Sequence, residues 1–178
     1  GNTTTSSAVA SVLLGLPPEE VTGRGAGLSS EGLARKRLAV RRAIACNAPD
    51  PSDAFDVLQK VGGLDLAGMA GAFLGGAAMQ MPVVIDGFIS AAAALLAARM
   101  CPAVVDYMLA SHVSGEPAAR LLLQELGLTP FLTANMTLGE GTGAVAAIPL
   151  LDMALAVYGE AYTFEQGGIG PYVPWEDT

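Results

Sequence analysis

The sequence has little of what metal sites and disulfide frameworks require. It contains one histidine and two cysteines among 178 residues, and Cys46 and Cys101 lie too far apart for a paired-cysteine zinc motif. A site with several imidazole ligands is therefore excluded, and we expect no metal. Free thiols without a disulfide pattern are typical of a cytoplasmic protein, which is the location that we predict.

Charged residues are also scarce, and basic ones are scarcer than acidic ones. Only 15% of residues are charged, and nine basic against seventeen acidic residues give a net charge of −8. A nucleic-acid-binding protein needs clustered lysine and arginine, so no nucleic-acid partner is expected. A small molecule with one phosphate is not excluded, because a local group of donors is enough to bind it.

Long hydrophobic runs are missing too. The longest apolar run, residues 66–79, is shorter than the roughly 20 residues that cross a bilayer, so we expect no membrane partner. Hydrophobic residues nevertheless make up 52% of the chain, which is typical of a folded domain.

Helical and strand patterns alternate along the chain. Short apolar runs at residues 82–85 and 104–110 predict buried parallel strands, with a third short strand at 131–133. Helices are predicted at residues 6–14, 53–61, 65–79, 88–99, 116–126 and 141–158, and from Ser29 or Ser30 onward. Pro149 is expected to bend the last helix or to mark its true start. This order predicts an α/β fold, a Rossmann-like parallel sheet flanked by helices in a three-layer sandwich.

One carboxylate, Glu140, lies in a glycine-rich run just before the last helix. Glycine allows a tight turn and a close approach to a ligand, so the carboxylate is a candidate general base. A helix-capping acid is the alternative interpretation, because acids are common in first helical turns.

Three features point to phosphate binding, and each has an ordinary alternative. Asn2 to Thr4 could cap a helix whose N-terminus accepts an anion, or could be a plain cap. The glycine loop, Gly23–Gly27, could offer successive N–H groups, or could be a connector. Five of the nine basic residues fall within residues 35–42, and a solvated helix face would explain them equally.

Polar residues also follow the predicted strands. Asp86 and Ser111 come at strand ends, and ligands of parallel sheets bind outside these ends, so we expect them to converge with Glu140. Asp86 could bond a sugar hydroxyl or could cap a helix. We interpret His112 as a structural residue and not as a catalytic one.

Six segments resemble motifs of the nicotinate-nucleotide–dimethylbenzimidazole phosphoribosyltransferase family, in the family's order. They are Gly1–Thr5, Gly23–Leu28, Val61–Gly68, Val84–Phe88, Ser111-His112 and Leu138–Gly143. The resemblance runs from residue 1 to about residue 164, and it matches only the C-terminal half of the family's proteins. We therefore expect a fragment of a larger domain, with residues 1–164 as the C-terminal part of that domain and residues 165–178 as a tail.

The resemblance implies an activity and a set of site residues. The activity is phosphoribosyl transfer from nicotinate mononucleotide to 5,6-dimethylbenzimidazole, which yields α-ribazole 5'-phosphate and nicotinate for the lower ligand of cobamides (vitamin B12). Glu140 would be the catalytic base, and no metal or cofactor would be needed. The implied substrate-binding residues are Gly1, Asn2, Gly25, Ala26, Gly27, Lys36, Asp86, Ser114, Leu138 and Gly139. The family usually has threonine at position 26 and alanine at 115, and often arginine at 137.

The resemblance also implies partners. The family is dimeric, and the helices at residues 68–79 and 88–99 could form the interface. The family's second active-site glutamate lies upstream of Gly1, so a separate N-terminal half could complete the site. The alternative is a non-catalytic structural or regulatory half that needs a partner chain. A dinucleotide-binding module is disfavoured, because Gly23–Leu28 follows no clear strand and no acidic residue has the ribose-binding context.

Overall fold

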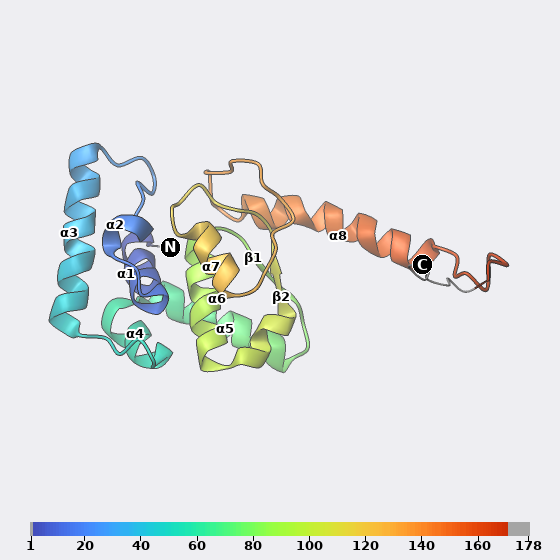
Figure 1. The fold of residues 1–178 in the computed structure, drawn as a ribbon, viewed down its shortest axis with the longest axis horizontal. Helices are drawn as coiled ribbons and strands as arrows, with labels where there is room; N and C mark the ends of the chain where they lie inside the picture. Colours follow the sequence, from blue (N-terminus) through green and yellow to red (C-terminus); the bar gives the residue numbers. More distant parts are fainter. Residues whose placement is uncertain (1, 171–178) are drawn as a thin grey trace, which may run out of the picture. The chain divides into compact units, whose positions relative to one another are not determined.

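The computed structural model describes residues 2–170, and the chain divides into two units, Gly1–Ala147 and Ile148–Thr178. The elements in chain order are α1 (Thr3–Leu14), α2 (Pro18–Val21), α3 (Ser30–Asn47), α4 (Ala54–Val61), α5 (Leu64–Ala78), β1 (Val83–Ile85), α6 (Phe88–Met100), the 3-10 helix η1 (Pro102–Tyr107), β2 (Met108–Ala110), α7 (Ala119–Glu125) and α8 (Thr142–Glu160). Figure 1 shows α1, α2 and α3 side by side, and α5 and α6 next to the strands. The predicted domain boundary after residue 164 stays a prediction.

The helices begin where the sequence places capping side chains. The Asn2 side chain accepts from the Thr4 amide at 2.8 Å, and Ser29 accepts from Gly32 at 3.1 Å. Asp53 caps α4 through Phe55 at 2.9 Å. Each cap satisfies amides that a first helical turn leaves without partners, so these predicted starts are confirmed to within a few residues.

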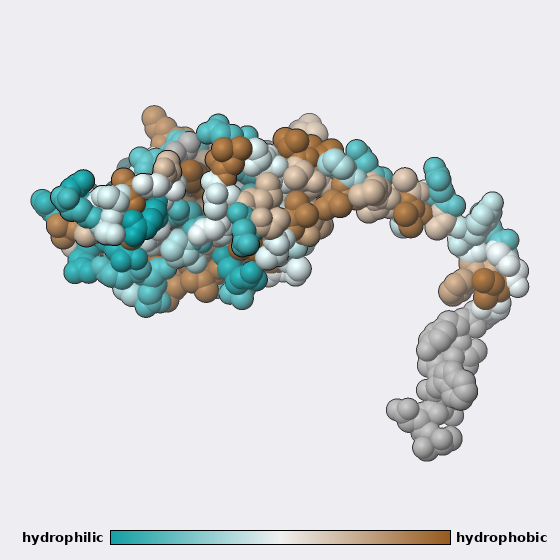
Figure 2. Space-filling model, turned by 90° about the horizontal axis from the view of Figure 1, so that it is seen from above, coloured by the Kyte–Doolittle hydropathy of each residue, from teal (hydrophilic) through white to brown (hydrophobic). Residues whose placement is uncertain are grey.

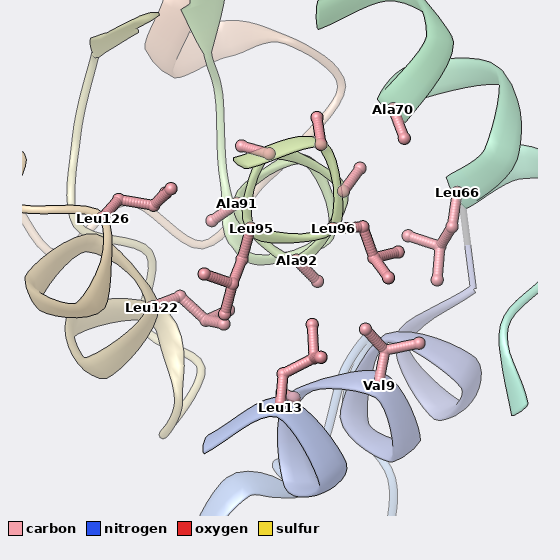
Figure 3. Close-up of a cluster of buried hydrophobic side chains, with 14 of the residues drawn as sticks. Val9, Leu13, Leu66, Ala70, Ala91, Ala92, Leu95, Leu96, Leu122 and Leu126 are labelled. Carbon is pink, nitrogen blue, oxygen red and sulfur yellow. The ribbon is translucent and has the colours of Figure 1, made fainter. Parts of the chain in front are cut away.

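The core of the first unit is organised around α6. Its residues 91–97 are all buried, and five of these seven are alanine. A helix that is apolar on every side must be enclosed, and small side chains let neighbouring helices approach closely. Figure 3 shows side chains of α1, α5 and α7 pointing toward this helix, including Val9, Leu66 and Leu122. Because residues 91–97 are enclosed inside this unit, they are not available for the dimer interface that the resemblance suggested for the helix at 88–99.

The strands are parallel, as predicted, and helices cover them. β1 pairs with β2 in the register Val83↔Met108 to Ile85↔Ala110. A third segment joins through a parallel bridge between His112 and Leu132. Both α5 and α6 contact β1, so the α/β class with parallel strands is confirmed. The sheet within residues 2–170 is small, with two strands and one bridge.

The predicted start of the second strand is wrong. Residues 102–107 form η1, and only residues 108–110 of the predicted strand at 104–110 form β2. Pro102 begins a helical turn, whereas the β-branched Val104 and Val105 had indicated a strand. The last helix, predicted at residues 141–158, is confirmed to within two residues at each end, and of the two roles expected for Pro149 that of marking the start is not found. α8 begins at Thr142 and continues through Pro149 to Glu160.

The part of α8 in the second unit is apolar and exposed. Met153, Leu155 and Val157 are each more than half exposed, and Figure 2 shows hydrophobic patches along this helix. By length and composition, α8 could cross a membrane. For a single helix, this is weak evidence of a membrane span. In the sequence, Pro149 and Asp152 interrupt this apolar run, so it is not evident there as the longest one.

Candidate functional site

Glu140 lies in an unusual backbone turn. Gly139, Glu140 and Gly141 have φ values of 75°, 58° and 77°, so three successive residues are left-handed. Glycine adopts this region freely, but a residue with a Cβ is strained there by on the order of 1 kcal/mol. The Thr142 hydroxyl donates to the Gly139 carbonyl at 2.7 Å and closes the turn. A strained non-glycine residue that the surroundings hold in place is a feature of functional sites.

Asp86 holds this turn from the end of β1. Its Oδ2 accepts from the Gly141 amide at 3.2 Å, and its Oδ1 accepts from the Ala144 amide at 3.0 Å. Both carboxylate oxygens therefore serve the first turn of α8, where free amides and the helix dipole favour a negative charge. The capping role that the sequence left open for Asp86 is present, and its contact with a sugar stays a prediction.

His112 packs beneath the same turn. The ring is 4% exposed, and its Nδ1 lies 3.0 Å from the Ser111 hydroxyl. A Cβ added to Gly143 would lie only 1.8 Å from that nitrogen, so α8 can begin here only with glycine at position 143. His112 is thus a packed, hydrogen-bonded residue of the kind that we predicted.

Lys36 forms one wall of a hollow of about 350 Å³, which we call the Lys36 hollow. It is lined by Thr3, Thr4, Arg24, Ala26, Gly27, Leu28 and Lys36. Lys36 is 7% exposed and donates to the Thr3 hydroxyl at 2.9 Å and to the Gly23 carbonyl at 3.0 Å. Burial lowers the pKa of Lys36, and the charge of Glu116 opposes that shift. An ammonium group has three donors, and Lys36 uses two of them within the described residues. One donor therefore remains to bind an anion.

The glycine loop offers fewer amides than predicted. The Gly25 N–H donates to Glu116 Oε1 at 2.8 Å, and the Gly27 N–H donates to the Arg24 carbonyl at 3.2 Å. The amides of Gly23, Arg24 and Ala26 have no hydrogen-bond partner within residues 2–170. The predicted row of successive free N–H groups is therefore interrupted at Gly25 and Gly27, and its role in phosphate binding stays a prediction.

The helix N-terminus at Asn2 is similarly occupied. The Asn2 side chain accepts from the amides of Thr4 and Thr5, at 2.8 and 3.4 Å. The backbone N–H of Asn2 donates to Asp65 Oδ2 at 2.8 Å. Thr3 and Thr4 nevertheless face the Lys36 hollow, so this end of α1 lies beside the candidate phosphate site. Gly1, the other residue predicted here, lies outside the described residues.

A second hollow of about 380 Å³ lies on the other side of the glycine loop, and we call it the Glu116 hollow. It brings together the predicted residues Gly25 and Ser114. Its lining also includes Thr22, Gly23, Arg24, Leu33, Arg37, Gly115, Glu116, Pro117 and Thr137. Leu138, Gly139 and Glu140 line neither hollow, and Leu138 is 76% exposed.

Two departures from the family pattern meet in this hollow. A Cβ on Gly115 would lie 2.9 Å from Thr137 Cγ2, which is closer than side chains normally pack. The Gly115 amide also donates to the Met136 carbonyl at 3.3 Å. Gly115 therefore fits Thr137, and the two unusual residues are explained as one local adjustment.

Four of the five basic residues of α3 separate into two groups. Arg35 pairs with Glu31 and Arg41 pairs with Glu19 on the exposed surface, as a solvated helix face would. Lys36 and Arg37 line the two hollows. Within residues 2–170, no three His, Cys, Asp or Glu side chains gather in a way that could hold a metal ion.

Comparison with known proteins places this geometry in a family. A family model described as "Phosphoribosyltransferase" matches residues 1–169. The chain belongs to this phosphoribosyltransferase family. It is 53% identical to the nicotinate-nucleotide–dimethylbenzimidazole phosphoribosyltransferase of Desulforudis audaxviator, over 95% of this chain and 48% of the relative. It is 52% identical to the Escherichia coli SMS-3-5 protein of the same name, over 88% of this chain and 44% of the relative.

A solved structure agrees with this membership. The crystal structure of CobT from Thermus thermophilus superposes with a TM-score of 0.87 and 47% sequence identity, over 96% of this chain and 50% of that chain. The chain thus spans about half the length of the curated family members that it matches.

Sequence reasoning missed two residues of this site, Glu116 and Gly143. Glu116 looked like the first residue of a helix, yet it bonds to a loop 91 positions earlier. Gly143 looked like one more residue of a glycine-rich run, yet its contact with His112 fixes its identity. Neither role has a local signal, because both depend on which segments the fold brings together.

Proposed function

We propose that the protein transfers a phosphoribosyl group from nicotinate mononucleotide to 5,6-dimethylbenzimidazole, in assembly of the cobamide lower ligand. The supporting observation is that family members sharing about half of its residues bear the name of this activity. The strained turn that presents Glu140, and the lysine at the glycine loop, are consistent with the chemistry.

In the proposed reaction, the bond between the anomeric carbon and the pyridinium nitrogen of the nucleotide breaks, and nicotinate leaves as a neutral pyridine ring. A benzimidazole nitrogen forms the new bond from the opposite face, so a β-nucleotide becomes an α-ribazole 5'-phosphate. Glu140 takes the proton from the second benzimidazole nitrogen. A positioned base of this kind contributes about 10² to 10⁴-fold to the rate.

We assign the 5'-phosphate to the Lys36 hollow. The free donor of Lys36 and the Ala26 amide would bind it there, beside Gly27, and Asn2 and Gly25 remain further proposed contacts. Ser114, Leu138, Gly139 and Asp86 remain proposed contacts of the rest of the nucleotide. Because the chain itself fixes the lysine and the loop, the phosphate would orient the anomeric carbon without further ordering.

The test is formation of α-ribazole 5'-phosphate from the two substrates, with Glu140→Gln as the variant and Glu160→Gln as a matched change at an exposed acid. We expect product with the parent and with Glu160→Gln, and at least about a hundredfold less with Glu140→Gln. Equal turnover by Glu140→Gln would overturn the base assignment. Activity that appears only after addition of the N-terminal half of a relative would place part of the site on a partner chain.

We further propose a homodimer that uses the exposed face of α5. This face carries Leu64 (92% exposed), Gly68, Gly71, Gly75 and Met79, and no charged residue. A Cβ on any of the three glycines would meet nothing within 4 Å, so packing inside the chain does not require them. Glycine costs a helix about 0.5–1 kcal/mol relative to alanine, and close contact with a second helix would explain its use. Sedimentation should show a dimer that Gly71→Glu dissociates.

The exposed apolar side chains of α8 suggest a second contact. Curated relatives are about twice as long, so they contain segments with no counterpart here. We propose that such a segment, in the same or a separate polypeptide, covers α8 in a cytoplasmic enzyme. The chain mixed with the N-terminal half of a relative should form a complex that Leu155→Asp weakens.

A further inference from the structure

Glu116 connects the two sides of the candidate phosphate site. Its Oε1 accepts from the Gly25 amide at 2.8 Å, which ties the loop after β2 to the glycine loop. A Cβ on Gly23 would lie 2.3 Å from Glu116 Oε2 and 2.6 Å from Pro117 Cδ, so the Glu116-Pro117 pair packs on the bare Cα of Gly23.

Lys36 holds the same glycine through its carbonyl. The Lys36 Nζ donates to the Gly23 oxygen at 3.0 Å. Gly23 is thus held between the ammonium of Lys36 and the carboxylate of Glu116. The Oε2 atom of Glu116 is buried, and it accepts no hydrogen bond from the residues described. A buried carboxylate oxygen without a donor is costly unless a nearby cation compensates its charge.

We propose that Glu116 is a positioning residue for the phosphate site: it clamps the glycine loop and places a negative charge across Gly23 from the Lys36 ammonium. The role in phosphate binding rests on the proposed function, whereas the clamp consists of contacts within this chain. Glu116 is not one of the proposed substrate contacts. Its Oε1 bonds to Gly25 and its Oε2 is buried, so it acts on the substrate only indirectly, through Lys36 and the glycine loop.

The charges around Lys36 support this assignment. Glu116 faces it from the loop after β2, and the described part of the chain places Arg24 in the same hollow, while α1 contributes the uncharged Thr3 and Thr4. Arg37 lies on the side of the Glu116 hollow. Burial disfavours a charged lysine and lowers its pKa, and Glu116 is the carboxylate that acts against this effect.

The chain has only two lysines, Lys36 and Lys60, which makes a direct test possible. Lysine labelled with ¹³C at Cε gives two NMR signals, and Lys60→Arg assigns them. Lys60 pairs with Asp56 at 2.9 Å and serves as an internal control. We expect the midpoint of the Lys36 titration to fall in Glu116→Gln, because a counter-charge is removed. The Lys60 midpoint should not move.

Glu125→Gln is the matched control, since Glu125 is an exposed acid paired with Arg99. A Lys36 midpoint that is the same in Glu116→Gln and Glu125→Gln would overturn the electrostatic part of the proposal. As the pH is raised, the affinity for inorganic phosphate should be lost at a lower pH in Glu116→Gln than in the parent or in Glu125→Gln, because the ammonium of Lys36 deprotonates earlier. Because these measurements need no turnover, their failure is distinguishable from failure of the proposed activity.

The clamp can be tested in the unmodified chain if the variant does not fold. The amide proton of Gly25 should change its chemical shift when acidification protonates the carboxylate that accepts its hydrogen bond, because the acceptor becomes neutral. A Gly25 amide that does not respond to pH would overturn the clamp. In folded variants, Glu116→Gln should retain hydrogen-exchange protection at Gly25, and Glu116→Ala should lose it.

Discussion

The carboxylate of Asp86 accepts a hydrogen bond from the amide of Gly141, the residue that follows Glu140, at 3.2 Å. Its other oxygen accepts from Ala144, so the end of β1 and the start of α8 share one acid. The turn that carries the candidate base is therefore fixed by a residue more than fifty positions away in the sequence.

The first prediction concerns this acid. Asp86→Ala should lower the free energy of unfolding by about 1–2 kcal/mol, because the first turn of α8 loses its acceptor. Urea unfolding checks this, with the exposed Asp106→Ala as a control that should change little. In the turnover assay, a lower kcat with a constant KM for nicotinate mononucleotide would indicate positioning of Glu140. A raised KM alone would instead indicate a sugar contact.

The second prediction concerns strain in the turn. Glu140→Gly should leave the free energy of unfolding unchanged or raise it by up to about 1 kcal/mol, because glycine tolerates a φ of 58°. Gly139→Ala and Gly141→Ala should each lower it by about 1 kcal/mol, since an added Cβ meets no neighbour and only the backbone is strained. Activity should be lost in Glu140→Gly. Destabilisation by that variant would contradict the idea that function maintains the strain.

The third prediction concerns the contact between Gly143 and His112. Gly143→Ala should destabilise the chain by about 1–3 kcal/mol, because its Cβ would collide with a buried ring. Gly159→Ala, in an open part of the same helix, should be neutral or stabilising. Thermal unfolding of the two variants separates the collision with His112 from the general effect of replacing a helical glycine. Equal changes in stability would refute the collision.

The fourth prediction concerns Ala26, which lines the Lys36 hollow. Ala26→Thr adds a hydroxyl beside the proposed phosphate position, and a hydrogen bond of about 0.5–1.5 kcal/mol should tighten binding by roughly two- to tenfold. Titration with nicotinate mononucleotide measures the effect, and Ala26→Val provides the same shape without the hydroxyl. If both variants bind alike, the phosphate lies elsewhere.

Local signals in the sequence predicted those parts of the fold that local interactions determine. Ser29 and Asp53 begin α3 and α4 as expected, because a cap bonds to amides two or three residues away. The strand at 104–107 was wrong, since β-branched residues do not distinguish a strand from a 3-10 turn that follows a proline. For α8, the proline signal was overridden by a helix that begins at the amides held by Asp86.

The candidate site was only partly predictable for a similar reason. Lys36 and the glycine loop stand out by composition, and the structure places them together. The loss of the Gly25 and Gly27 amides to internal partners depends on Glu116 and on the shape of the loop, which no local pattern encodes. Composition therefore identified Lys36 and the glycine loop as candidates for phosphate binding. Which of their N–H donors remain free depends on tertiary contacts.

Both loops of the site are closed by bonds between distant segments, Gly25 to Glu116 and Gly141 to Asp86. Such contacts form late during folding, because the long intervening chain must first be ordered. We therefore expect the alanine-rich centre at α6 to become protected from hydrogen exchange before either loop does. The functional region would then also be the first to open when the protein is stressed, so loss of activity should precede loss of helix.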